Sequence, residues 1–215
     1  MLREFEGPAG KLVGELELPD GAPVAAAIVC HPHPLHGGSL RNTIVVRTAR
    51  ALRSAGLATL RFNFRGVEGS AGSHDGSAEV EDARAALDVL ARELPELPLW
   101  GAGYSFGSRM VLELALRSAV ERVILIAPPV ALYDMTGLAR LRTPGLVVSG
   151  GSDEFGTGED LTRQELDLPD TLRRIEIPGA DHFFRGRTPL VEQAVLEYAR
   201  AATGWNRPPN ATRST

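Results

Sequence analysis

The chain is poor in cysteine and in long apolar runs, and it has no excess of positive charge. Cys30 is the one cysteine among 215 residues, so an intramolecular disulfide is excluded. It ends the apolar run 25–30, which predicts a buried structural thiol. No apolar run approaches the roughly 20 residues of a transmembrane helix, and residues 1–7 lack the apolar core of a signal peptide. We therefore expect a cytoplasmic protein without a membrane partner.

The charge pattern also excludes several partners. The formal net charge is −4 at pH 7, and the arginines are interspersed with acids, as on a solvated surface. We therefore expect no nucleic-acid partner. The glycines of residues 66–76 are not followed by Lys-Ser or Lys-Thr, so this stretch is not a phosphate-binding loop. We expect no cofactor.

Short β-like runs alternate with amphipathic helical patterns along most of the chain. The expected strands cover residues 23–30, 57–64, 123–127, 146–149 and 172–177, and a further strand is expected around Trp100. The expected helices cover residues 39–54, 78–94, 106–118 and 190–202. Two alternating runs within residues 2–18 predict an antiparallel hairpin at the edge of the sheet.

This alternation predicts an α/β fold. Strands as apolar as 123–127 suit a parallel sheet that is covered on both faces. We expect a doubly wound, mostly parallel sheet with helices on both faces and no cap domain. Residues 1–204 are expected to form one domain, and residues 205–215, rich in Pro, Asn, Thr and Ser, a flexible tail.

The most informative motif is Gly-x-Ser-x-Gly at residues 103–107, between an expected strand and an expected helix. A serine on such a sharp turn needs small neighbours, which Gly103 and Gly107 provide. The turn exposes the Ser105 hydroxyl at a helix N-terminus, where backbone N–H groups favour negative charge. Ser105 is therefore the candidate nucleophile.

A serine at neutral pH needs a general base, and the base needs a carboxylate. His182 follows the last expected strand, and Asp153 follows the strand before it. Serine, acid and histidine, each at the carboxyl end of a strand, occur in the order of an α/β-hydrolase triad. Glu154 and Asp160 are rival acids, lying farther from the strand end than Asp153 does.

The oxyanion formed on attack needs two backbone donors. One is the N–H of Phe106, the residue after the nucleophile. The other is expected from the loop at residues 31–38, in which two prolines have no N–H to donate. His33 and Leu35 remain as donors, and His33 is preferred because it lies nearer the strand end.

Other residues near strand ends have two interpretations, substrate binding or bracing of loops. They are His31, Leu35, Asn63, Arg65 and Tyr104. For Asn63 and Arg65 we favour bracing, with Asp75 or Glu79 as partner. His31, His33 and His36 also allow a metal site, but their loop has no carboxylate. We therefore expect no metal, and hydrogen bonds that brace the loop instead.

The chain resembles the α/β-hydrolase superfamily over about residues 10 to 203. More narrowly, it resembles small, lidless bacterial serine hydrolases related to dienelactone hydrolases. The resemblance rests on His31-Pro32-His33-Pro34 with Gly37-Gly38, Arg61-Phe62-Asn63-Phe64-Arg65-Gly66, Gly103-Tyr104-Ser105-Phe106-Gly107 and Asp181-His182-Phe183-Phe184. It implies Ser105 as nucleophile, His182 as base and Asp153 as acid. Dienelactone hydrolases carry a cysteine nucleophile, so Ser105 favours ordinary esters or thioesters over lactones.

The spacing between strands predicts an open site. Only residues 128–144 separate two expected strands where many relatives insert a cap. This argues against lipase action on bulk lipid. We expect a carboxylesterase or thioesterase for small or medium substrates, acting through an acyl-enzyme on Ser105. The alternatives are a metal-dependent hydrolase on the histidine loop, a non-catalytic binding protein, and an acyltransferase or peptidase. The sequence is compatible with a homodimer but does not select one.

Overall fold

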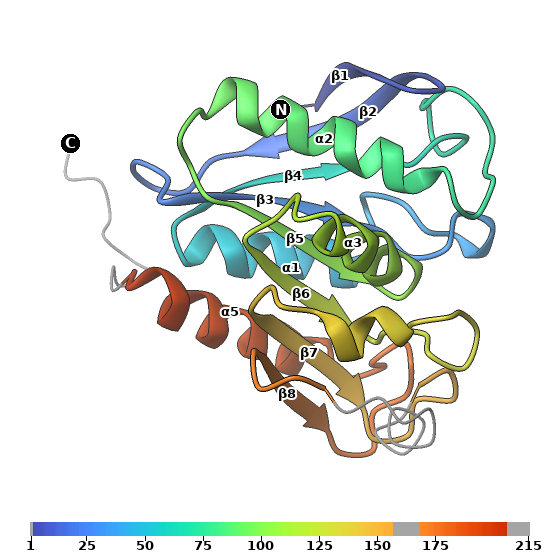
Figure 1. The fold of residues 1–215 in the computed structure, drawn as a ribbon, viewed down its shortest axis with the longest axis vertical. Coiled ribbons are helices and arrows are strands. Elements are labelled where there is room, and N and C mark those ends of the chain that lie inside the picture. The colour runs from blue at the N-terminus through green and yellow to red at the C-terminus, as the bar shows by residue number, and fades with distance from the viewer. Residues whose placement is uncertain (1, 157–167, 206–215) are drawn as a thin grey trace.

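The structure is a computed structural model, and it describes residues 2–156 and 168–205. The expected tail therefore lies outside the described residues, apart from Trp205, whose ring lies against Gly56. The described strands form one eight-stranded sheet (Figure 1). They are β1 (Leu2–Gly7), β2 (Gly10–Glu17), β3 (Ala25–Cys30), β4 (Leu57–Phe62), β5 (Leu99–Tyr104), β6 (Arg122–Ile126), β7 (Gly145–Gly150) and β8 (Leu172–Ile177).

The sheet is mostly parallel, as the sequence predicts. Its strand order is β1-β2-β4-β3-β5-β6-β7-β8. The hairpin β1–β2 is antiparallel and forms one edge, and β2 pairs antiparallel with β4. The other strands run parallel to one another. The carboxyl ends of β3 and β5–β8 therefore meet at one edge of the sheet.

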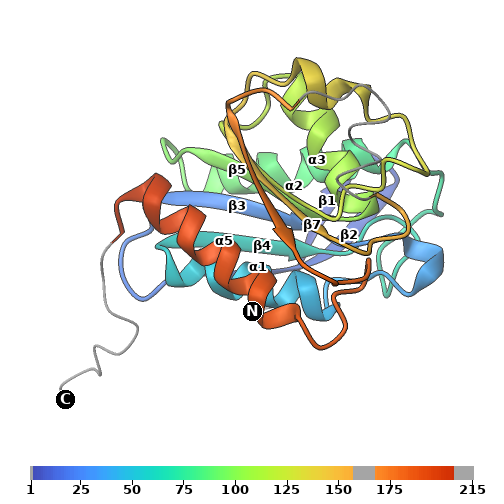
Figure 2. The ribbon, with the colours of Figure 1, turned by 90° about the horizontal axis from the view of Figure 1, so that it is seen from below.

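Helices cover both faces of the sheet (Figures 1 and 2). One face carries α1 and α5, which also contact each other, and the other face carries α2 and α3. The bounds are α1 (Thr43–Ser54), α2 (Glu79–Glu93), α3 (Phe106–Leu116) and α5 (Thr188–Thr203). No helix in the described ranges is both long and apolar enough for a bilayer span.

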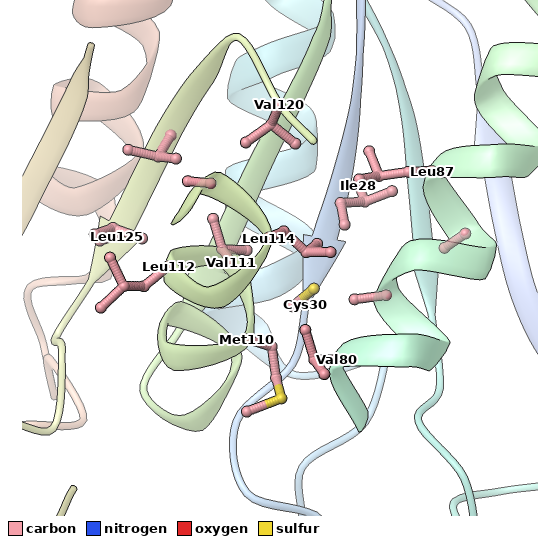
Figure 3. Packing of buried hydrophobic residues seen from close by; sticks show 14 of the residues in the cluster. Ile28, Cys30, Val80, Leu87, Met110, Val111, Leu112, Leu114, Val120 and Leu125 are labelled. Atoms are coloured by element: carbon pink, nitrogen blue, oxygen red, sulfur yellow. The ribbon is translucent and has the colours of Figure 1, made fainter. Parts of the chain in front are cut away.

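Two apolar layers flank the sheet because residues of a strand point alternately to its two faces. In β3, Ala26, Ile28 and Cys30 pack toward α2 and α3, whereas the odd-numbered residues pack toward α1 and α5. Figure 3 shows the Cys30 sulfur among apolar side chains that include Met110 and Val80. Cys30 is free and fully buried, and burial raises the pKa of its thiol well above the ordinary value. The expected structural thiol is confirmed.

Several expected elements are shorter in the structure, and two of them end or begin at a contact that explains the difference. The helix expected from residue 39 begins at Thr43, because Asn42 has extended backbone angles and its side chain caps the amide of Ile44 at 2.9 Å. The strand expected to reach residue 64 ends at Phe62. The amide of Phe64 donates instead to the imidazole of His31.

The loops after the parallel strands are short where a cap would be inserted. Between β6 and β7, residues 127–144 form only the 3₁₀ turn η2 (Thr136–Arg140). After β3, the chain forms the 3₁₀ turn η1 (Pro34–His36). The carboxyl edge of the sheet is thus not covered by an inserted domain at the expected position.

Candidate active site

Ser105 lies between β5 and α3 in a backbone conformation that few residues adopt. Its φ is 53° and its ψ is −119°, and strain of this kind is concentrated at functional sites. A Cβ on Gly103 would lie 2.2 Å from the carbonyl oxygen of Gly107, and one on Gly107 would lie 2.4 Å from that of Cys30. The two glycines therefore allow the sharp turn and the close approach of α3 to β3.

The structure brings Ser105, His182 and Asp153 together from three loops. The Ser105 Oγ lies 2.8 Å from the Nε2 of His182. The Nδ1 of the same ring lies 2.9 Å from each carboxylate oxygen of Asp153. Asp153 is fully buried, and only 4% of His182 and 9% of Ser105 is exposed. This is the geometry of a nucleophile, a base and an orienting acid.

The rival acids lie elsewhere. Glu154 accepts a weak hydrogen bond from the backbone amide of His182 at 3.4 Å and does not pair with its ring. Asp160 lies outside the described residues. Asp153 also accepts the amide of Phe155 at 2.8 Å, which orients its carboxylate. Asp153 is thus the acid that contacts the imidazole.

The two preferred oxyanion donors are free to donate. In the described ranges, neither the N–H of Phe106, at the start of α3, nor that of His33 has an acceptor. The amide of Leu35 instead donates to the Nδ1 of His33 at 3.2 Å, and 74% of the Leu35 residue is exposed. Leu35 is therefore neither a free donor nor part of the cavity wall.

A cavity of about 610 Å³ opens over Ser105. Within the described ranges, its lining contains no Asp, Glu, Lys or Arg. The lining residues are Pro32, His33, His36, Asn42, Tyr104, Ser105, Phe106, Leu132, Tyr133, Phe155, His182 and Phe183. Apolar and aromatic groups dominate this wall, which suits an uncharged ligand.

Sequence reasoning missed four of the apolar lining residues. Phe155 and Phe183 adjoin the acid and the base along the chain, and this adjacency is a signal that could have found them. Leu132 and Tyr133 follow β6, so their position after a parallel strand is a second signal. Leu132 and Phe183 are 57% and 46% exposed, so they lie where the cavity opens to solvent.

Tyr104 both lines the cavity and braces the site. Its hydroxyl donates to the backbone carbonyl of His182 at 3.0 Å, and its ring lies beside the imidazole. Burial, together with the nearby Asp153 carboxylate, raises the pKa of the phenol, so it remains a donor. The phenol thus ties the loop of the base to the strand that precedes the nucleophile.

Asn63 and Arg65 brace loops and do not line the cavity. The Oδ1 of Asn63 accepts the amide of Leu40 at 2.7 Å. Arg65 binds the two carboxylate oxygens of Asp82 at 2.9 and 2.7 Å. The expected partner, Asp75 or Glu79, is wrong, because Glu79 accepts the amides of Asp75 and Gly76 and the ring of His74.

The histidines of the loop after β3 have different surroundings. His31 is fully buried and contacts backbone groups on both sides of its ring. The His33 ring packs against those of His36 and His74, tilted to the first and edge-on to the second, at centroid distances of 4.8 and 4.6 Å. Over residues 2–156 and 168–205, no three His, Cys, Asp or Glu side chains are grouped so that they could hold a metal.

Comparison with known proteins identifies the family. Residues 27–204, most of the chain, match the alpha/beta hydrolase domain family. The chain belongs to this family. The hydrolase is similar to an alpha-beta serine hydrolase homologue from Coxiella burnetii, with 35% identity and a TM-score of 0.85. That alignment covers 92% of this chain and 96% of the other.

Two further relatives span nearly the same length. A lidless alpha/beta serine hydrolase from Xanthomonas campestris is 32% identical with a TM-score of 0.86, covering 97% of this chain and 96% of the other. An uncharacterized protein of Rickettsia prowazekii is 35% identical over 90% of this chain and 86% of its own length. The expected α/β-hydrolase fold without a cap is confirmed, and the chain is an enzyme of the serine hydrolase type.

Proposed function

We propose that this hydrolase cleaves small or medium uncharged carboxylic esters or thioesters through an acyl-enzyme on Ser105. The observation that carries the proposal is the continuous hydrogen-bonded series Ser105–His182–Asp153, with distances of 2.8 and 2.9 Å. Each member follows a different strand, and all three are at least nine-tenths buried. Such an arrangement supports nucleophilic catalysis by serine.

The Nε2 of His182 accepts and returns the protons of the reaction. The Ser105 Oγ attacks the carbonyl carbon while the Nε2 of His182 takes its proton. The Asp153 carboxylate then stabilises the imidazolium. When the tetrahedral intermediate collapses, the same Nε2–H protonates the leaving alcohol or thiol. Water enters in the second half, loses a proton to His182, and releases the acid as Ser105 regains its hydrogen.

The amides of Phe106 and His33 are the proposed oxyanion donors. Both lack an acceptor in the described part of the chain, and both residues line the cavity beside Ser105. The Phe106 amide lies in the first turn of α3, where the helix dipole adds to the stabilisation of negative charge. Loss of one such donor costs about 10²–10³ in turnover.

The cavity supports a small-molecule substrate. A volume of about 610 Å³ fits the range of ligand sites, about 300–1,000 Å³. The aromatic and aliphatic lining suits an apolar acyl or alcohol group. The exposed Leu132 and Phe183 extend this lining toward solvent. The far end of a longer substrate group would therefore lie outside the cavity, in water. This favours small and medium substrates over lipid.

The test is Ser105→Ala, assayed with 4-nitrophenyl acetate and butyrate. We expect the burst and the steady-state release of 4-nitrophenol to fall to the uncatalysed level, while circular dichroism and thermal unfolding remain close to wild type. The matched control is Ser149→Ala, because Ser149 is also a fully buried serine and its hydroxyl has no partner in the described residues. This control should retain activity.

Three results would contradict the proposal. Retained activity in Ser105→Ala would exclude a serine acyl-enzyme. Failure of wild-type Ser105 to react with a fluorophosphonate, detected by mass spectrometry of the intact protein, would instead favour a non-catalytic binding protein. Activity that is lost on treatment with a chelator, but not with the fluorophosphonate, would point to metal-dependent hydrolysis.

A further inference from the structure

The side chain of His31 contacts the loop that carries the proposed oxyanion donor His33. It follows β3, is fully buried, and packs edge-on against Phe64 with ring centroids 4.7 Å apart. Its Nε2 lies 3.1 Å from the backbone nitrogen of Phe64. Its Nδ1 lies 2.6 Å from the carbonyl oxygen of Pro32. The ring is absent from the cavity wall, so it does not contact substrate.

These two contacts assign the tautomer of His31. The backbone amide of Phe64 only donates, so Nε2 must be unprotonated and accept. The carbonyl of Pro32 only accepts, so Nδ1 must carry the proton and donate. Burial lowers the pKa of His31 to about 4, in agreement with a neutral ring. The imidazole is therefore held by the Phe64 amide, and its own N–H fixes the direction of the Pro32 carbonyl.

The Pro32 carbonyl belongs to the same peptide unit as the N–H of His33. In a trans peptide the C=O and N–H groups point in opposite directions, and no cis peptide occurs in the described chain. Holding the carbonyl of Pro32 against His31 therefore directs the N–H of His33 to the other side. On that side, no group in the described chain accepts this N–H.

We propose that His31 is a positioning residue for the oxyanion hole, acting through the Pro32–His33 peptide. This inference rests on the proposed function, which makes the His33 N–H an oxyanion donor. It assigns the buried histidine of the loop a role in turnover that is separate from metal binding and from substrate contact.

Neighbouring contacts hold the same segment from other directions. The carbonyl of His33 accepts the amides of His36 and Gly38 at 3.0 and 3.1 Å, so the next peptide is also fixed. A Cβ on Gly38 would lie 2.0 Å from the Pro32 oxygen. Glycine at this position therefore lets the chain pass beside the carbonyl that His31 holds. The donor is preorganised, as electrostatic stabilisation of a transition state requires.

Two substitutions separate the two hydrogen bonds of His31. In His31→Asn, the side-chain amide nitrogen replaces Nδ1 and keeps a donor for the Pro32 carbonyl, but the Phe64 amide loses its acceptor. In His31→Gln, the side-chain oxygen reaches the place of Nε2 and keeps the acceptor for Phe64, but the Pro32 carbonyl loses its donor. The pair thus tests which contact affects turnover.

We expect His31→Gln to lower kcat by about tenfold or more, with KM within about twofold, because an oxyanion donor acts in the transition state and not in substrate binding. We expect His31→Asn to keep kcat within about threefold of wild type, although the buried Phe64 amide without an acceptor lowers its stability. The measurements are kcat and KM for 4-nitrophenyl butyrate, with thermal unfolding of each folded variant. A trifluoromethyl ketone, which forms a tetrahedral oxyanion on the serine, should lose affinity for His31→Gln in parallel with kcat.

Several outcomes would overturn the inference. A wild-type kcat in His31→Gln would overturn it. An equal loss of kcat in both variants would also overturn it, because that result indicates a purely structural role. Unchanged affinity of the ketone for His31→Gln would also contradict it. The comparison is made beside Ser105→Ala. If Ser105→Ala remains active, the proposed function fails. If it is inactive while His31→Gln is fully active, only the role of His31 fails.

Discussion

The histidines of this hydrolase differ in the groups that their rings contact. His182 contacts a carboxylate and a hydroxyl, and so has the surroundings of a base. His31 contacts two backbone groups, and so has the surroundings of a neutral brace. His33 packs against two other imidazoles, and burial, together with His74 and His36, lowers the pKa of its ring. Each difference follows from which groups the fold brings to the ring.

The buried state of His31 predicts a loss of stability at acidic pH. Its pKa is about 4 in the folded protein, against an ordinary value of 6.5. Between these values the unfolded chain binds a proton that the folded chain does not, so the free energy of unfolding decreases as pH falls from 6.5 toward 4. At pH 5 this contribution is about 2 kcal/mol.

Urea unfolding at pH 7.5 and pH 5 measures this contribution. We expect wild type to lose about 2 kcal/mol more than His31→Asn between the two pH values, because asparagine does not titrate. Equal losses in the two proteins would show that His31 is protonated in the folded state as readily as in the unfolded chain.

At the scale of elements, the contact between β5 and α3 positions the nucleophile. Gly101 and Gly103 lie two residues apart on β5 and face the same helix. A Cβ on Gly103 would meet the backbone of Gly107, whereas one on Gly101 would meet the side chain of Val111 at 2.8 Å. A side chain can rotate away, but the backbone of the first helical turn can move only if Ser105 moves with it.

This difference predicts unequal effects of two matched substitutions. We expect Gly103→Ala to lower kcat by about 100-fold or more, since a misplacement of about 1 Å has effects of this size. We expect Gly101→Ala to stay within a few-fold of wild-type kcat, with a stability loss of about 1–3 kcal/mol from overpacking. The measurements are kcat for 4-nitrophenyl butyrate and urea unfolding. Similar kcat values in the two variants would contradict the role assigned to the backbone contact.

At the scale of the whole molecule, the lining of the cavity and the net charge of the chain both disfavour an anionic substrate. At the carboxyl edge of the sheet, the loops after β3, β5, β6, β7 and β8 surround the cavity. The described lining has no fully charged side chain, and the chain as a whole carries a formal charge of −4. An anionic substrate would thus lose hydration in the cavity without gaining a cationic partner. It would also approach a molecule of like charge.

We therefore expect a preference for neutral over anionic esters of similar length. The kcat/KM for 4-nitrophenyl butyrate should exceed that for the 4-nitrophenyl monoester of succinic acid by about tenfold or more. Added salt should reduce the difference only in part, because it screens the net charge but does not restore hydration inside the cavity. Equal kcat/KM values would show that the anionic group finds a cation that the cavity lining does not include.

Much of the fold was predictable because strand and helix patterns are local. The apolar runs that became β6 and β7 identified buried parallel strands, and the turn glycines around Ser105 identified a sharp strand-to-helix turn. Boundaries were less predictable where a distant group decided them. The strand β4 ends at Phe62, and the amide of Phe64 donates to the imidazole of His31 and not to a neighbouring strand. His31 lies far away in the sequence.

By itself, the sequence determined the α/β alternation, the order of Ser105, Asp153 and His182, and the exclusion of an intramolecular disulfide, since composition and periodicity are properties of the chain alone. Only the tertiary structure decided that Asp82, and not Asp75 or Glu79, binds Arg65, that His31 faces the Pro32 carbonyl, and which aromatic side chains surround the cavity. The reason is physical. These contacts join loops from separate strands, and their distances depend on how the whole sheet packs rather than on any local pattern.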